Sequence, residues 1–188
     1  PSELGVPQGV KAIAYLGRLE KEKNVTALVE AMRQIPDAEL WIAGAGAEEP
    51  VLRRMAGPNV RFLGFLPPHQ VPLFLRAADL LAMASHHEGL ATVVLQAWAT
   101  GKPVVVPPVG DFPYLMRDSG GIITPDNRTP SVAQGLRSML QQIHTPDAAM
   151  AESYKLRRKS EAYGWERLTD QVIRIYEEAM SRRLAVVG

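Results

Sequence analysis

Two basic side chains lie five positions apart in a short loop near the start of the chain. Arg18 and Lys23 belong to residues 17–24, GRLEKEKN, which follow an apolar run typical of a buried strand. Two cations at a strand end and a helix start can clamp a diphosphate from two sides. The alternative is a solvated loop in which these cations pair with Glu20 and Glu22. The loop alone leaves both interpretations open.

A carboxylate and an amide, Glu88 and Gln96, lie eight positions apart in residues 82–103, AMASHHEGLATVVLQAWATGKP. An i, i+3, i+4, i+7, i+8 apolar stripe predicts a helix that ends at Gly101; its members are Leu90, Val93, Val94, Ala97 and Trp98. Glu88 and Gly89 would then lie at the start of that helix, where free backbone N–H groups favour an anion. The alternative for Glu88 is an exposed carboxylate that the helix dipole stabilises without any ligand.

Six apolar runs alternate with helical patterns and must position these groups. The strands are expected at residues 10–16, 38–43, 59–63, 79–84, 103–106 and 121–124. Continuous apolar strands that alternate with helices predict an α/β fold, a Rossmann-like doubly wound parallel sheet of six strands with helices on both faces. Further helices are expected at residues 129–143, 146–163 and 165–183. In such a sheet, ligands bind beyond the carboxyl ends of the strands.

Composition narrows the function classes. The 188 residues carry 21 basic and 20 acidic side chains, a net charge of +1, which argues against a nucleic-acid binder. The chain has no cysteine, so disulfides and thiolate metal sites are excluded. No apolar run reaches the roughly 20 residues that span a bilayer, and we expect a cytoplasmic location. Residues 1–9 read as a linker and residues 10–188 as one domain. Because the chain starts without a methionine, we expect it to be a piece of a longer protein.

Other candidate groups also follow strands. Gly44 and Gly46 form a G-x-G turn after the second strand, and Leu66 follows the third. The first strand is followed by Gly17-Arg18 and not by G-x-G-x-x-G, which argues against a nicotinamide dehydrogenase. His86 and His87 have no other histidine nearby in sequence, so we expect no metal site.

Taken in order, these motifs resemble the C-terminal, nucleotide-sugar-binding domain of the family 4 GT-B retaining glycosyltransferases. The motifs are G-R-L-x-x-x-K-N, G-x-G, V-x-F-x-G-x-L and E-x7-Q, and they cover about residues 10–125. The final W-E-R-L segment resembles the helix that crosses back toward the partner domain in that family.

The resemblance implies a role for each matching residue. Arg18 and Lys23 would hold the diphosphate, Glu88 would contact the donor sugar, and these three are the expected catalytic groups. The backbone of Gly89, Leu90, Ala91 and Thr92 would bind the distal phosphate, Leu66 the base and Gln96 the ribose, with Gly17, Gly44 and Gly46 lining the site. Ala91 and Gln96 replace a glycine and a glutamate of the family pattern; the alanine is acceptable if that residue is helical. Asp111 and Tyr114 depart from the family's G-G-x-P-E segment.

The implied function is retaining transfer of a sugar from a nucleoside diphosphate to a glycan, lipid or small-molecule acceptor, without a cofactor or an obligatory metal. The acceptor would bind an N-terminal domain that these residues lack, so the isolated domain is expected to be inactive alone. Peripheral association of the full enzyme with the inner face of a membrane is left open. Two alternatives are a GT-B sugar-nucleotide epimerase and a non-catalytic sugar-nucleotide-binding module. The base, the sugar and the linkage are not determined by the sequence.

Overall fold

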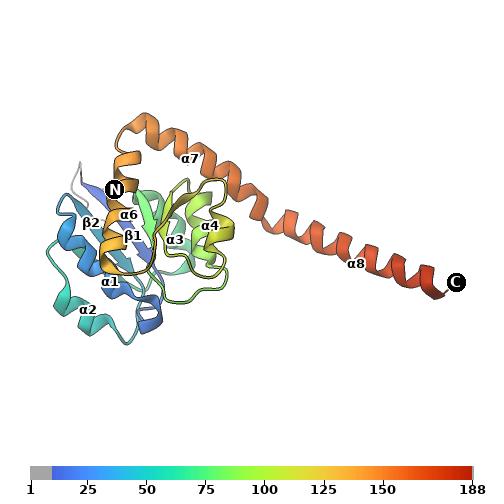
Figure 1. Cartoon of the computed structure of the whole chain (residues 1–188), viewed down its shortest axis with the longest axis horizontal. Coiled ribbons are helices and arrows are strands. Elements are labelled where there is room, and N and C mark those ends of the chain that lie inside the picture. The colour runs from blue at the N-terminus through green and yellow to red at the C-terminus, as the bar shows by residue number, and fades with distance from the viewer. Residues whose placement is uncertain (1–9, 188) are drawn as a thin grey trace.

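A computed structural model describes residues 10–187, with side chains described as far as Ser181. Its centre is a parallel sheet of six strands in the order β3-β2-β1-β4-β5-β6 (Figure 1). The strands are β1 (Lys11–Leu16), β2 (Ala38–Ala43), β3 (Val60–Gly64), β4 (Leu80–Ala82), β5 (Val104–Val106) and β6 (Gly121–Ile123). The predicted doubly wound α/β fold is confirmed.

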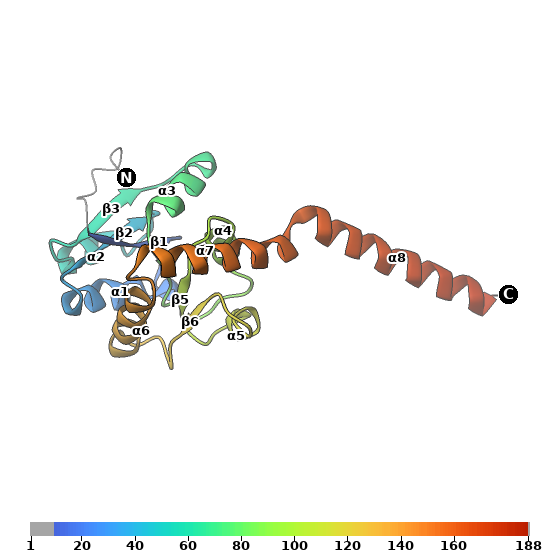
Figure 2. The same cartoon turned by 90° about the horizontal axis from the view of Figure 1, so that it is seen from above.

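Helices cover both faces of this sheet. They are α1 (Val25–Ala31), α2 (Glu49–Met55), α3 (Val71–Ala77), α4 (Thr92–Ala99), α5 (Phe112–Leu115), α6 (Thr129–Gln142), α7 (Pro146–Ser160) and α8 (Trp165–Val187). Short 3-10 turns are η2 (Lys21–Lys23), η3 (Met32–Gln34), η4 (Pro68–Gln70) and η5 (Glu161–Tyr163). Figures 1 and 2 show these helices wrapped around the sheet, except for α8, which projects away from the body.

The core has two halves, one on each face of the sheet. Ile13 and Tyr15 of β1 pack with α1, α2 and α6, whereas Ala12 and Ala14 pack with α3, α4 and α5. Leu156 of α7 joins the second half. Because most strand residues face one buried half or the other, the strands appear in the sequence as largely apolar runs. The charged residues within them are Lys11, Glu39 and Arg61.

The direction of winding reverses between β1 and β4. From β1 the chain builds outward through β2 and β3, then returns to place β4 on the other side of β1. The carboxyl ends of β1 and β4 are therefore neighbours at the point where doubly wound sheets bind ligands. The loops after these strands hold Arg18, Lys23 and Glu88.

The helix after β4 begins later than the sequence predicts. α4 starts at Thr92, and its N-cap Ala91 is extended, with φ −76° and ψ 95°. Leu90 lies before the helix and is exposed, so its place in the apolar stripe is wrong, while Val94, Ala97 and Trp98 are buried. The preceding loop is held by Gly110, where a Cβ atom would stand 2.2 Å from the carbonyl oxygen of Glu88. That close backbone approach keeps this loop out of the helix.

The last helix exposes large apolar side chains along its length. Trp165, Ile175, Tyr176 and Met180 are all more than half exposed on α8. No helix in the described part of the chain is long and apolar enough to cross a bilayer. The expected cytoplasmic location is not tested by this and stays a prediction.

Candidate functional site

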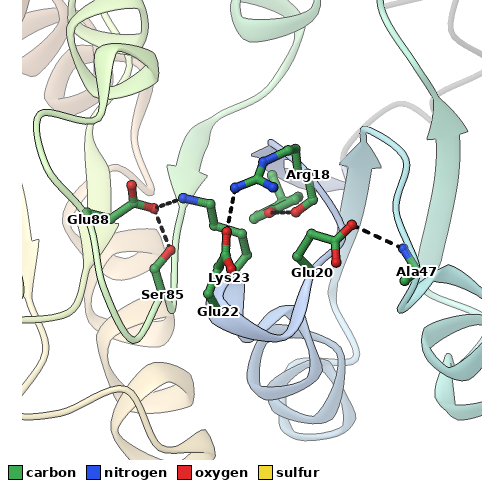
Figure 3. Close-up of polar contacts among 8 residues, drawn as sticks. Arg18, Glu20, Glu22, Lys23, Ala47, Ser85 and Glu88 are labelled. Carbon is green, nitrogen blue, oxygen red and sulfur yellow. Dashed lines mark hydrogen bonds and ion pairs between the residues drawn. The ribbon is translucent and has the colours of Figure 1, made fainter.

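The side chains of Lys23 and Glu88 meet between the carboxyl ends of β1 and β4 (Figure 3). Lys23 Nζ donates to Glu88 Oε1 at 2.8 Å, and Ser85 Oγ donates to the same oxygen at 2.7 Å. The two charged side chains are only 18% and 8% exposed. The alternative interpretation, an exposed Glu88 stabilised by the helix dipole, therefore does not hold, because α4 begins four residues later and Lys23 supplies the positive charge.

Asn24 fixes the loop that presents Lys23. Its backbone is left-handed, with φ 48°, a conformation that asparagine adopts more readily than most residues. Its side-chain amide donates to the carbonyl oxygens of Ala84 at 3.0 Å and Asn127 at 2.9 Å. The backbone N–H of His86 also donates to the carbonyl of Glu22 at 2.8 Å. These bonds fasten the loops after β1 and β4 together and direct Lys23 toward Glu88.

Arg18 stands on the solvent side of this pair. Its guanidinium pairs with Glu22 and remains 68% exposed. Its carbonyl oxygen accepts a 2.7 Å hydrogen bond from the hydroxyl of Tyr15. Burial, and then the nearby charge of Glu88, raises the pKa of Tyr15, so this hydroxyl stays protonated and keeps donating. The backbone of Arg18 is thus fixed while its side chain faces water.

The expectation that both loop cations pair with carboxylates of the same loop holds only in part. Arg18 pairs with Glu22, but Lys23 reaches across to Glu88. Glu20 pairs with neither cation in the described residues and instead accepts from the backbone N–H of Ala47 at 3.4 Å.

The predicted glycines Gly17, Gly44 and Gly46 pack closely at the ends of β1 and β2. Gly44 has φ +141°, and a Cβ atom there would stand 1.8 Å from the carbonyl oxygen of Gly17. At Gly46 a Cβ atom would stand 2.4 Å from the carbonyl oxygen of Leu19. Close packing of the turn against the Arg18 loop therefore requires these glycines, independently of any ligand.

The remaining predicted residues surround this centre. Gly89, Leu90 and Thr92 are exposed in the loop and at the first position of α4, and Gln96 is exposed on its second turn. Leu66 is half-buried in an apolar cavity of about 310 Å³ lined also by Leu63, Gln70, Leu73 and Phe74. Neither Leu66 nor Gln96 hydrogen-bonds to the Lys23–Glu88 pair in the described part of the chain.

Position 91 does not require the glycine of the family pattern, although Ala91 is not helical as we expected. The residue is extended and not helical, but a φ of −76° is open to any L-amino acid. The alanine therefore introduces no backbone strain, and its side chain is buried against the second half of the core.

Sequence reasoning missed the role of three residues that shape the site: Asn24, Ser85 and Asn127. Asn24 follows Lys23 directly, and the left-handed preference of asparagine at a helix start was an available signal. No local pattern marks Ser85 or Asn127, because their partners lie in other loops. Asn127 also contacts His86, its amide lying 2.8 Å from the ring Nδ1. Within residues 10–181, no three histidine or carboxylate side chains gather as metal ligands would; that the reaction needs no metal stays a prediction.

We expect the buried ion pair to stabilise the fold and the exposed one not to. Glu88→Gln leaves the ammonium of Lys23 without a carboxylate in a half-buried position, which should lower the free energy of unfolding by about 1–3 kcal/mol. Glu22→Gln removes the same charge from the exposed Arg18 pair and should change it by less than about 0.5 kcal/mol. Urea unfolding of both variants measures the difference, and equal losses would contradict it.

Comparison with known proteins shows the family to which the chain is similar. The model of the family described as "Glycosyl transferases group 1" matches residues 1–157. The D-inositol 3-phosphate glycosyltransferase of Corynebacterium aurimucosum is 28% identical over 95% of this chain and 46% of its own length. The chain thus spans about half the length of the curated relatives it matches.

Solved structures share the fold. Sucrose-phosphate synthase from Thermosynechococcus elongatus superposes with a TM-score of 0.83 at 22% identity, over 96% of this chain and 48% of that one. HepE from Anabaena, solved in complex with UDP, gives 0.82 at 22% identity, over 94% and 51%. By the match of its family model over most of its length, the chain belongs to the glycosyl transferases group 1 family.

Proposed function

We propose that residues 10–188 form the donor-binding domain of a retaining glycosyltransferase, and that a nucleoside-diphosphate sugar binds between the ends of β1 and β4. One observation carries the proposal: Lys23, Glu88 and Arg18 come together at the switch point of the sheet. Two cations suit a diphosphate, and a carboxylate suits sugar hydroxyls. The UDP held by the related fold of HepE, and the glycosyltransferase names of the relatives, support it.

The leaving diphosphate would bind both cations, in place of Glu22 at Arg18 and together with Glu88 at Lys23. Arg18 would exchange Glu22 for a phosphate oxygen, which its exposed position allows without moving the backbone. Lys23 would share its three N–H donors between Glu88 and the diphosphate. As the bond to the sugar breaks, negative charge grows on the diphosphate, and fixed cations stabilise it in that state.

Glu88 keeps one oxygen available for the sugar. Both of its bonds, from Lys23 and from Ser85, go to Oε1. Within residues 10–181, no donor is bonded to Oε2. Since no buried side-chain oxygen lacks a partner in this part of the chain, Oε2 is accessible to solvent. Glu88 would therefore accept from a sugar hydroxyl through Oε2 while Oε1 keeps the carboxylate fixed, which orients the sugar for transfer.

The remaining parts of the proposal rest on the resemblance. The backbone of residues 89–92 would bind the distal phosphate, the neighbourhood of Leu66 the base, and Gln96 the ribose. The acceptor would bind a unit outside these residues, because transfer needs a closed cleft between donor and acceptor. We therefore propose that this chain alone binds a donor and transfers no sugar, and that the reaction uses neither a cofactor nor a metal.

Arg18→Gln should weaken nucleoside-diphosphate binding about tenfold or more, because a charge-assisted bond to phosphate is lost. Calorimetric titration with UDP, GDP and ADP identifies the base and measures the loss. The melting temperature should not change, since the side chain is mostly exposed. Arg158→Gln on α7 is the matched control: that arginine also pairs with a glutamate and is 66% exposed. Equal affinities of the Arg18 variant, the control and the unaltered chain would refute the diphosphate site.

Glu88→Gln should separate sugar recognition from nucleotide recognition. The variant should bind the bare nucleoside diphosphate within about twofold of the unaltered chain, yet lose most of the additional affinity that the preferred sugar provides. Competition titrations with the diphosphate and its sugar conjugate give both values. An equal loss for the two ligands would mean that Glu88 acts on the diphosphate side and not on the sugar.

A further inference from the structure

A cavity of about 310 Å³ opens at the amino ends of β4 and β5. It lies at the opposite edge of the sheet from Lys23 and Glu88, since all strands are parallel. Its walls come from α3, from the turn before β5 and from α7. Three cationic side chains line it, one from each wall: Arg76, Lys102 and Arg157.

The positive charge of this cavity exceeds the negative charge that the protein places beside it. Asp79 is the one carboxylate among the described lining residues, and both of its oxygens are engaged elsewhere. Lys11 Nζ donates to Oδ1 at 3.0 Å, and the backbone N–H of Ala12 donates to Oδ2 at 2.8 Å. Within residues 10–181, the side chains of Arg76, Lys102 and Arg157 have no ion pair or hydrogen bond. The cavity therefore presents three cations and one carboxylate, and the oxygens of that carboxylate are bonded to Lys11 and Ala12.

Gly101 brings two of these cations together. Its φ is +77°, and a Cβ atom there would stand 2.0 Å from Ser153 Oγ and 3.0 Å from Arg157 Nε. The glycine thus lets α7 lie directly on the turn that carries Lys102. Burial lowers the pKa of Lys102; the charge of Asp79 opposes this shift, and the charges of Arg157 and Lys11 add to it more weakly. A bound anion would offset that unfavourable environment.

We propose that this cavity is a second anion site, which binds a small phosphate-bearing molecule. Guanidinium groups present paired N–H donors that match phosphate oxygens, and a half-buried ammonium adds a point charge. The volume is near the lower end of small-molecule pockets, which suits a phosphate or diphosphate group with a small substituent. The site shares no residue with the donor site, so it does not depend on the proposed transfer activity.

A titration of the whole chain with inorganic pyrophosphate tests the site. The amide resonances are followed by ¹H–¹⁵N NMR. We expect saturable shifts at Gly101, Lys102 and Ser153, separate from any at residues 17–23. Lys102→Gln and Arg157→Gln should each weaken this binding about tenfold. Arg158→Gln, one position along α7 and paired with Glu161 at 3.9 Å, should leave it unchanged.

Shifts confined to residues 17–23 and 88–92 would mean that pyrophosphate binds the donor edge alone, and would overturn the second site. Shifts at Gly101 that persist unchanged in both Lys102→Gln and Arg157→Gln would also overturn it. Equal melting temperatures of the variants establish that a loss of binding is not a loss of folding. Saturable shifts at Gly101 without any at residues 17–23 would support the second site and count against the donor site.

Discussion

The ion pair between Lys23 and Glu88 joins the two loops on either side of the switch point, and the candidate site depends on it. Each partner is nearly buried, so neither charge could remain there alone at low cost. Ser85 and the network around Asn24 hold the pair in one geometry. The two partners therefore depend on each other, and together they keep a cation and a carboxylate at the edge where the sheet can bind a ligand.

The rest of the fold positions this pair. Parallel strands bring all carboxyl ends to one edge, and the reversal between β1 and β4 makes their loops neighbours. The close glycine contacts at Gly44 and Gly46 press the turn after β2 against the Arg18 loop. Outside the pair, the side chain of Arg18 is paired, within residues 10–181, with the exposed carboxylate of Glu22, which a diphosphate can replace. The buried Lys23–Glu88 pair, which is fixed, thus lies beside the exposed Arg18–Glu22 pair, which a ligand can displace.

The sequence predicts the sheet and the location of Arg18 and Lys23 because apolar runs and strand ends are local properties. The partner of Lys23 could not be predicted in the same way, since Glu88 lies 65 positions away. The bond from Asn24 to Asn127 spans 103 positions. The start of α4 was placed too early because the contact of Gly110 with the preceding loop comes from another strand end. Periodicity within a segment carries no information about such contacts.

The most direct test of this account is the affinity of Glu22→Gln for the nucleoside diphosphate that the chain prefers. If the exposed pair occupies the phosphate position of Arg18, removing the carboxylate frees the cation and removes a repulsive charge. The account predicts binding tighter by about three- to tenfold at low salt, with the advantage shrinking as ionic strength rises. Unchanged binding would contradict it, because the Arg18–Glu22 pair would then have no part in holding the donor. Weaker binding would also contradict it, because Glu22 would then support the donor and not compete with it.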